Sequence, residues 1–152
     1  MITYGVESWF DALPEMQPMW PLHWQELGVH KDVMPLDPDL DQYAALARSG
    51  VLHLVVARKD GRMIGYHISF VRPHLHYRTC LTSFEDLYFL HPEHRKGFMS
   101  VANLFRAVEK TLRARGVKRM LCGTKHHKSL VRLFMRLGFI MCDLTVSKWI
   151  GE

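Results

Sequence analysis

Two neighbouring groups of residues in the middle of the chain have the types and spacing needed for chemistry. Glu85 and Asp86 are adjacent carboxylates inside an otherwise apolar stretch, residues 84–90. A buried carboxylate costs free energy unless it is paired or functional, and burial raises its pKa toward the range of a useful base. A short way along the chain, Arg95 and Lys96 form a basic turn. Together these groups indicate a proton-abstracting site beside a site for an anion.

The elements around the basic turn explain why it would bind an anion. An apolar run ends at Leu90, and a helical repeat of apolar residues follows Gly97, so we expect a strand, a tight turn and a helix over 97–115. Backbone N–H groups at the start of such a helix point at whatever lies over the turn, and the two cations add to their field. The glycine patterns of P-loops and of dinucleotide-binding turns are absent. We therefore expect a phosphate site at residues 95–100.

The remaining hydrophobic periodicity predicts an α+β chain, with a mixed sheet and helices on its faces. We expect strands at 1–7, 51–58, 62–71, 80–90, 117–122 and 139–149. We expect helices at 38–49, 97–115 and 126–137. Residues 8–29 should form short kinked helical pieces because prolines interrupt them, and their aromatic side chains should belong mostly to the core.

Glycines mark the turns between these elements. The Asp60-Gly61 pair predicts a hairpin between the second and third strands, because such pairs supply the positive φ angles that the turn needs. Gly65, inside the third strand, indicates a bulge or a close backbone approach. Residues 72–79, which are polar and rich in histidine, are expected to form a connection rather than strand.

Composition bounds the class of protein. The chain has 152 residues, of which 48% are hydrophobic, so we expect one domain spanning 1–152. The formal net charge of +5 favours an anionic ligand or partner, and both a nucleotide and a nucleic acid would qualify. Three cysteines without CxxC spacing indicate free thiols, and neither a membrane-spanning run nor a signal pattern is present. We therefore expect a cytoplasmic protein.

The turn resembles the acetyl-CoA turn of the GNAT acyltransferases, whose usual form is P-x-x-(R/Q)-x-x-G-x-(G/A). Residues 92–95, Pro-Glu-His-Arg, match the first half of this pattern. The chain then departs from it, because Gly97 comes one residue early and residues 98–100 are not glycine.

A narrower likeness extends over more of the chain. The stretch from Asp86 to Gly97, together with HYRT at 76–79 and RLGF at 136–139, is similar to short, often phage-encoded members of the GNAT family. The resemblance covers roughly residues 20–150. It implies a three-layer α/β/α fold, with a mostly antiparallel sheet of six to seven strands and about four helices. It also implies that residues 8–29 cover the acceptor side of the site.

The resemblance further implies which residues bind the cosubstrate, acetyl-CoA. The turn would hold the diphosphate, and the backbone of Phe89 and Leu90 would lie beside the pantetheine chain, where a free N–H could polarise the thioester carbonyl. Lys125, His126 and His127 follow a strand end and either reach the phosphates or form a solvated basic face, two alternatives that we weigh evenly. The residues expected in the turn are Arg95, Lys96, Gly97, Phe98, Met99 and Ser100.

Transfer of an acetyl group to an amine also needs a base and an acid. Glu85 and Asp86 are the candidate bases, on opposite faces of their strand, and we weigh them evenly. The alternative for at least one of them is a structural ion pair with an arginine such as Arg72 or Arg78.

The sequence leaves several candidates for the acid that protonates the leaving thiolate. Many GNAT enzymes carry a tyrosine at the position that corresponds to Phe134 here, and phenylalanine cannot give a proton. Tyr88, Tyr77 or solvent would have to replace it.

The resulting hypothesis is an N-acetyltransferase that uses direct attack of an amine on acetyl-CoA in a ternary complex. Phe134 and the altered turn favour one alternative, a GNAT-shaped phage structural or host-interaction protein without turnover. The positive charge permits another, a nucleic-acid-modifying relative. The acceptor is not identified by the sequence, and the protein is expected to be a monomer or a homodimer.

Histidine pairs also invite a metal hypothesis. They occur at His74 and His76, at His91 and His94, and at positions 126 and 127. Zinc sites usually need four converging ligands, and nothing in this spacing forces the pairs together. We therefore expect no metal.

Overall fold

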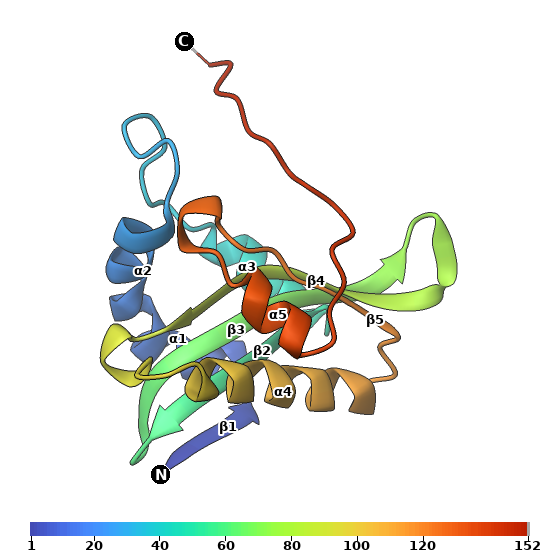
Figure 1. Cartoon of the computed structure of the whole chain (residues 1–152), viewed down its shortest axis with the longest axis horizontal. Coiled ribbons are helices and arrows are strands. Elements are labelled where there is room, and N and C mark those ends of the chain that lie inside the picture. The colour runs from blue at the N-terminus through green and yellow to red at the C-terminus, as the bar shows by residue number, and fades with distance from the viewer. Residues whose placement is uncertain (152) are drawn as a thin grey trace.

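The computed structural model describes residues 1–151 and contains one mixed sheet (Figure 1). Its five strands lie in chain order, and the first three neighbouring pairs are antiparallel while β4 and β5 are parallel. The strands are β1 (Ile2–Val6), β2 (Leu52–Lys59), β3 (Arg62–His74), β4 (Tyr77–Leu90) and β5 (Arg119–Leu121). The mixed, mostly antiparallel sheet is confirmed, but it has five strands instead of the expected six to seven.

Helices cover both faces of this sheet. Five α-helices and three short 3-10 helices lie within the described residues. The α-helices are α1 (Trp9–Met16), α2 (Trp20–Leu27), α3 (Leu40–Arg48), α4 (Met99–Ala114) and α5 (Val131–Arg136). The 3-10 helices are η1 (Gln17–Met19), η2 (Pro92–His94) and η3 (His126–Lys128). None of these helices is long and apolar enough to cross a membrane.

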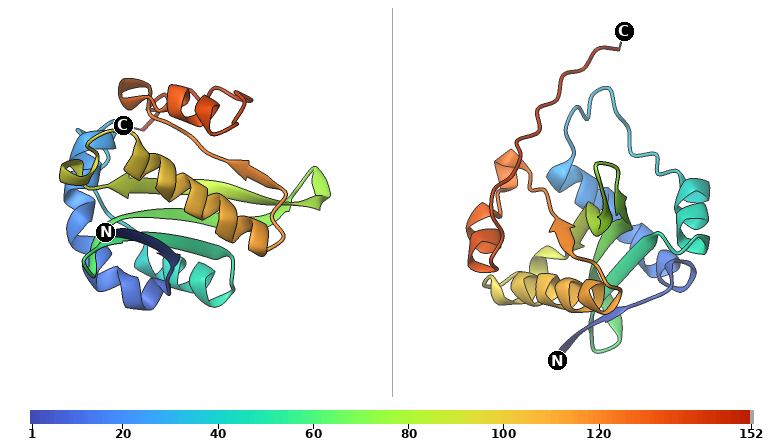
Figure 2. Two further views of the ribbon diagram at one scale, coloured as in Figure 1. Left: turned by 60° about the horizontal axis from the view of Figure 1, so that its bottom comes forward. Right: turned by 90° about the vertical axis from the view of Figure 1, so that its right-hand side faces the viewer.

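The core divides into two layers, one on each side of the sheet (Figure 2). On one face α1 and α3 pack against alternate side chains of β2 and β3, with Trp9 and Trp20 both buried. On the other face α4 buries the apolar stripe that the sequence predicted. The three-layer α/β/α architecture is therefore confirmed. Of the aromatic residues in 8–29, Trp9 and Trp20 belong to the core, whereas Trp24 is half-buried and Phe10 is exposed.

The parallel pair β4–β5 is short, and this shapes the molecule. Three residues of β4, Thr82 to Phe84, pair with β5. On its other side β4 continues to pair with β3 as far as Leu90. Beyond Phe84 the two parallel strands therefore separate, while α4, which connects them along the chain, packs on the face formed by β1, β2 and β3.

Three expected elements differ from the structure. Residues 139–149 form no strand and leave the body as an extended segment with exposed apolar side chains (Figure 1). The expected helix at 126–137 is instead η3 followed by the short helix α5, because Ser129 and Leu130 depart from helical geometry. Residues 72–79 are not a polar connection: β3 and β4 run through them and form a protruding hairpin.

Glycines behave largely as expected. Asp60 and Gly61 have φ angles of 51° and 84° and form the β2–β3 hairpin turn. Gly65 permits a close backbone approach: a Cβ added there would lie 2.5 Å from the carbonyl oxygen of Phe89 and 2.9 Å from the Cα atom of Leu90. The β3 backbone can therefore lie against the end of β4 because residue 65 has no side chain.

This close approach predicts the effect of one methyl group. Gly65→Ala should lower the free energy of unfolding by about 1–3 kcal/mol, because the new Cβ forces β3 and β4 apart. Gly5→Ala is the matched control, since a Cβ at this other strand glycine meets no atom within 4 Å. Urea denaturation of both variants checks the prediction, and equal stabilities would contradict it.

Candidate active site

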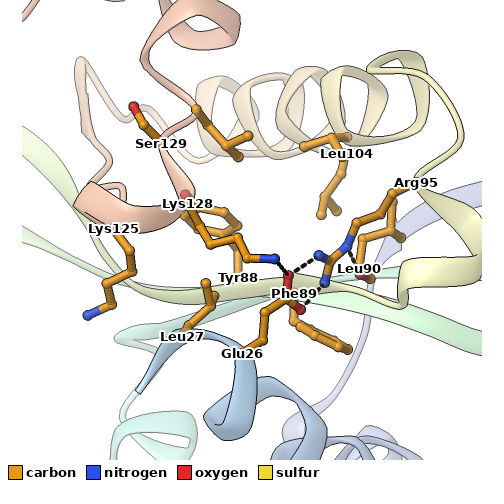
Figure 3. Close-up of a pocket in the computed structure, with 12 residues that line it drawn as sticks. Glu26, Leu27, Tyr88, Phe89, Leu90, Arg95, Leu104, Lys125, Lys128 and Ser129 are labelled. Carbon is orange, nitrogen blue, oxygen red and sulfur yellow. Dashed lines mark hydrogen bonds and ion pairs between the residues drawn. The ribbon is translucent and has the colours of Figure 1, made fainter. Parts of the chain in front are cut away.

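A cavity of about 260 Å³ lies in the gap beyond the end of the β4–β5 pairing (Figure 3). Its lining comes from α2, the end of β4, the turn into α4, α4 itself and the segment after β5. The lining residues are Glu26, Leu27, Tyr88, Phe89, Leu90, Arg95, Val101, Leu104, Lys125, Lys128, Ser129 and Leu130. The cavity therefore joins residues 26–27 to segments that lie 60 to 100 positions later in the chain.

Phe89 and Leu90 lie where the sequence analysis placed them, at the end of β4 and on the cavity wall. Their side chains are buried, and β5 does not pair with them. The carbonyl oxygen of Leu90 accepts a hydrogen bond from the Nε atom of Arg95. The edge of β4 beyond Phe84 is thus available to the amide groups of a ligand. The Leu90 carbonyl at its end already accepts a hydrogen bond from Arg95.

The turn before α4 is open. Lys96, Gly97, Phe98 and Met99 are exposed, and Gly97 has a φ angle of 75° with no atom within 4 Å of a built Cβ. No side chain caps the N-terminus of α4. Within the described residues, no side chain accepts a hydrogen bond from the first backbone N–H groups of this helix. These N–H groups can therefore donate to a phosphate.

Two residues of the turn make contacts that fix its position. The carbonyl oxygen of Ser100 accepts a hydrogen bond of 3.1 Å from the hydroxyl of Tyr4 in β1. The guanidinium of Arg136, at the end of α5, lies 5.5 Å from the ring centroid of Phe98. The turn thus contacts the sheet through β1 and also contacts α5.

Arg95 does not present a free cation to this turn. Its guanidinium binds both carboxylate oxygens of Glu26, with an Nη2–Oε2 distance of 2.8 Å, and lies 5.0 Å from the ring centroid of Phe89 (Figure 3). The two cations expected at the turn therefore differ: within the described residues Lys96 forms no ion pair, whereas Arg95 does.

The segment after β5 supplies further cations. Lys125 lines the cavity, and Figure 3 shows its amino group directed away from the other labelled residues. His127, also expected near the phosphates, has its Nε2 atom 3.2 Å from the backbone carbonyl oxygen of Glu26. Lys128, which the sequence analysis did not single out, lies 3.2 Å from the Oε1 atom of Glu26.

Glu85 occupies the environment of a general base. Its Oε2 atom accepts a 2.6 Å hydrogen bond from the N–H of Gly123, just past the end of β5. Burial raises the pKa of Glu85 to about 7, while the Gly123 hydrogen bond opposes this shift and Asp86 adds to it. A carboxyl group with this pKa is partly ionised at neutral pH and can accept a proton there.

Asp86 lies on the opposite face of β4, as expected. The β3–β4 register passes from Ile68↔Leu87 to Ser69↔Glu85, so Asp86 is the extra residue of a β-bulge. Its carboxylate accepts a hydrogen bond from the hydroxyl of Tyr43 in α3. Partial desolvation raises its pKa, and the Tyr43 hydrogen bond opposes this.

Neither carboxylate forms the expected alternative ion pair. Within residues 1–151, Arg72 and Arg78 make no ion pair with Glu85 or Asp86. The guanidinium of Arg72 instead lies 4.6 Å from the ring centroid of Phe84. The two carboxylates are satisfied by a backbone N–H and a tyrosine hydroxyl, and neither forms an ion pair within the described residues, although the charge of Lys125 opposes the raised pKa of Glu85.

Tyr88 is the tyrosine that the structure brings to the site. It lines the cavity, and its hydroxyl donates a 3.1 Å hydrogen bond to the carbonyl oxygen of Gly123. Burial raises its pKa to about 12, so the hydroxyl keeps its proton at neutral pH. Phe134 is buried beside it, with 6.3 Å between the two ring centroids, whereas Tyr77 is exposed in the β3–β4 hairpin.

The structure brings the His91 and His94 pair together with a carboxylate. In and beside η2, ligand atoms of His91, Glu93 and His94 lie within 4.8 Å of one another. Spacing alone gave no reason for this arrangement, which results from the tight 3-10 turn after Pro92. The carboxylate of Glu93 is largely exposed and lies 3.8 Å from the Nδ1 atom of His91.

Sequence analysis missed several residues of the site. Glu26 and Leu27 sit at the end of an aromatic, proline-rich region whose pattern indicates core packing. Gly123 and Lys128 follow β5 in a segment that was expected to lead into a regular helix. An acidic residue in the last turn of α2, where the helix dipole disfavours negative charge, was the one available signal for Glu26.

Residues 9–139 match the model of the acetyltransferase (GNAT) family. No curated protein sequence matches the chain.

Solved structures share the fold. A ribosomal-protein-alanine N-acetyltransferase from Brucella melitensis biovar Abortus 2308 has a TM-score of 0.76 and 16% identity over 100% of this chain and 99% of its own. The aminoglycoside N-acetyltransferase AAC(6')-Iy, in complex with a bisubstrate analogue, has a TM-score of 0.68 and 19% identity over 99% of both chains. A predicted acetyltransferase with acetyl-CoA from Clostridium acetobutylicum has a TM-score of 0.68 and 12% identity over 99% of this chain and 97% of its own.

The raised pKa of Glu85 predicts a pH-dependent stability. Between about pH 4.5 and 7 the folded chain keeps a proton on Glu85 that the unfolded chain has lost, so this residue lowers stability as the pH rises. Glu85→Gln removes the effect. Its stability relative to the native chain should therefore increase by about 3 kcal/mol across that range.

Urea denaturation at pH 4.5 and pH 7.5 measures this difference. Glu93→Gln is the control, because the Glu93 carboxylate is 79% exposed and should show no comparable change. A stability difference for Glu85→Gln that is the same at both pH values would contradict the raised pKa.

Proposed function

Because the chain belongs to the acetyltransferase (GNAT) family, we propose that it transfers an acetyl group from acetyl-CoA to an amine, by direct attack within a ternary complex. The observation that supports this most is the separation of β4 from β5, which leaves a cavity beside the unpaired edge of β4 and below an open helix N-terminus. The narrower likeness to phage-encoded members stays a prediction.

In this proposal the pantetheine chain lies along the β4 edge, beside Phe89 and Leu90. The diphosphate lies over Gly97 and the first N–H groups of α4, where the backbone donors and the helix dipole favour negative charge. Lys96 adds a positive charge that no carboxylate of the described residues neutralises. The thioester then lies near Tyr88 and Glu85, farther along the same strand.

Two groups on one face of β4 carry the proton transfers. The amine nitrogen forms a bond with the thioester carbonyl carbon, and Glu85 accepts the proton that the nitrogen loses. The carbon–sulfur bond breaks as the tetrahedral intermediate collapses, and Tyr88 donates its proton to the departing thiolate. Return of the proton from Glu85 to Tyr88, through water, restores both groups.

Asp86 remains the second candidate base. Its carboxylate faces α3 and already accepts the Tyr43 hydroxyl proton in a hydrogen bond. Glu85 is favoured because its pKa is about 7 and because it shares Gly123 with Tyr88.

Two departures from the family pattern favour a different function, that of a GNAT-shaped protein that binds acetyl-CoA without catalysing transfer. Phe134 is buried where many relatives carry an acidic tyrosine, and Phe98 and Met99 stand in the turn where glycine is usual. Acetyl-CoA binding together with no transfer to any member of a broad amine panel would support this alternative.

Binding of acetyl-CoA is the first test of the proposal. Isothermal titration calorimetry should detect binding to the native chain, and Lys96→Glu should weaken it by roughly tenfold, because a charge beside the diphosphate is reversed. Lys110→Glu is the control for net charge, since Lys110 lies exposed near the far end of α4. Absence of measurable binding to the native chain would overturn the proposed function.

Activity as a function of pH identifies the base. Values of kcat/KM should fall about tenfold per pH unit below pH 7, because Glu85 must be ionised to accept a proton. Glu85→Gln should lose roughly 100-fold or more in kcat, whereas Asp86→Asn should keep the inflection near pH 7. The reverse pattern would assign the base to Asp86.

A further inference from the structure

The carboxylate of Glu26 occupies a cationic site inside the cavity. Its side chain is only 12% exposed, and both of its oxygens bind the guanidinium of Arg95 in a bidentate arrangement. Lys128 approaches one of these oxygens at 3.2 Å. Figure 3 shows all three side chains converging at one point of the cavity.

The position of Glu26 is not explained by helix stability. It lies in the last turn of α2, where the helix dipole disfavours a negative charge, and no basic residue of α2 compensates it there. The compensating charges come from elsewhere: Arg95 precedes α4 and Lys128 follows β5. These two cations lower the pKa of Glu26 to about 2, so it is ionised at every physiological pH.

The charges at this point do not balance. One carboxylate faces two cations, so the cluster keeps a net positive charge next to the open turn at Gly97. A diphosphate diester carries one negative charge on each phosphate and would match the two cations better than Glu26 does. An anion of this kind and Glu26 therefore compete for the same donors.

We infer that Glu26 is an internal anion that holds Arg95 and Lys128 in the empty site and is exchanged for the phosphates of the incoming cosubstrate. This inference rests on the proposed function. It gives the site a selectivity that depends on charge, because a ligand without phosphates has no means of replacing Glu26. It also lowers the affinity for acetyl-CoA, because the ion pairs of Glu26 with Arg95 and Lys128 must be broken before the phosphates bind.

Calorimetry on two ligands tests the exchange. Glu26→Gln should bind acetyl-CoA roughly tenfold more tightly than the native chain, since no ion pair has to be broken. S-acetylpantetheine lacks the phosphates, so the native chain and Glu26→Gln should bind it equally. Absence of detectable binding to both proteins is also consistent with this expectation. Glu93→Gln removes the same charge from η2, close to Arg95 in sequence, and should stay within about twofold of the native chain.

Several outcomes would overturn the inference. Unchanged or weaker binding of acetyl-CoA by Glu26→Gln would show that the carboxylate is only structural. Equal gains for both ligands would show that it blocks the cavity sterically, and an equal gain in Glu93→Gln would show a general effect of net charge.

Two controls separate this inference from the proposed function and from misfolding. If neither the native chain nor Glu26→Gln binds acetyl-CoA, both proposals fail, whereas binding without a gain sinks only the exchange. If Glu26→Gln does not fold, judged by thermal unfolding, Glu26→Asp takes its place. That variant keeps the charge but shortens its reach, so it should show a smaller gain of the same sign.

Discussion

The structure depends on the early end of the parallel pairing between β4 and β5. Three residues of β4 are paired on this side, while its other side is paired to β3 as far as Leu90. A strand edge left open inside a protein has N–H and C=O groups that need partners. Arg95 supplies one partner by donating to the Leu90 carbonyl, whereas Gly123 binds the side chains of Glu85 and Tyr88 and not the β4 backbone. The edge beside the cavity therefore keeps backbone groups that a ligand could pair with.

Two glutamates near this opening show how surroundings set the properties of one residue type. Glu26 is surrounded by cations, and its pKa falls to about 2. Glu85 is half-buried and has no cation in contact, and desolvation raises its pKa to about 7. Carboxylates whose environments push their pKa values apart usually have different tasks. Here the permanently charged one is suited to electrostatic work, and the other is suited to proton transfer.

The sequence predicted the parts of the fold that follow from local patterns. The strand ending at Leu90, the turn at Gly97 and the long helix after it were expected because apolar spacing and a glycine mark them directly. The layers and the mostly antiparallel sheet followed from the same spacing and from the family resemblance. The segment 139–149 has the composition of a strand, but strand structure also needs a partner edge, and composition does not show whether one is available.

The candidate site was predictable only on one side. Glu85, Asp86 and Tyr88 stand out because polar groups are rare inside an apolar strand. Glu26 and Lys128 lie about 100 residues apart in sequence, and their pairing depends on how α2 and the segment after β5 pack together. Long-range contacts of this kind leave no local pattern, so neither residue was identified in advance.

Gly123 couples two side chains of the cavity region mechanically. The N–H of Gly123 binds Glu85, and its carbonyl oxygen binds Tyr88, so a single residue touches both side chains to which we assign the proton transfers. A displacement of the chain after β5 would stretch both bonds together. Widening of the cavity would then alter the pKa values of Glu85 and Tyr88 together. The width of the cavity and the protonation of these two side chains would therefore be coupled.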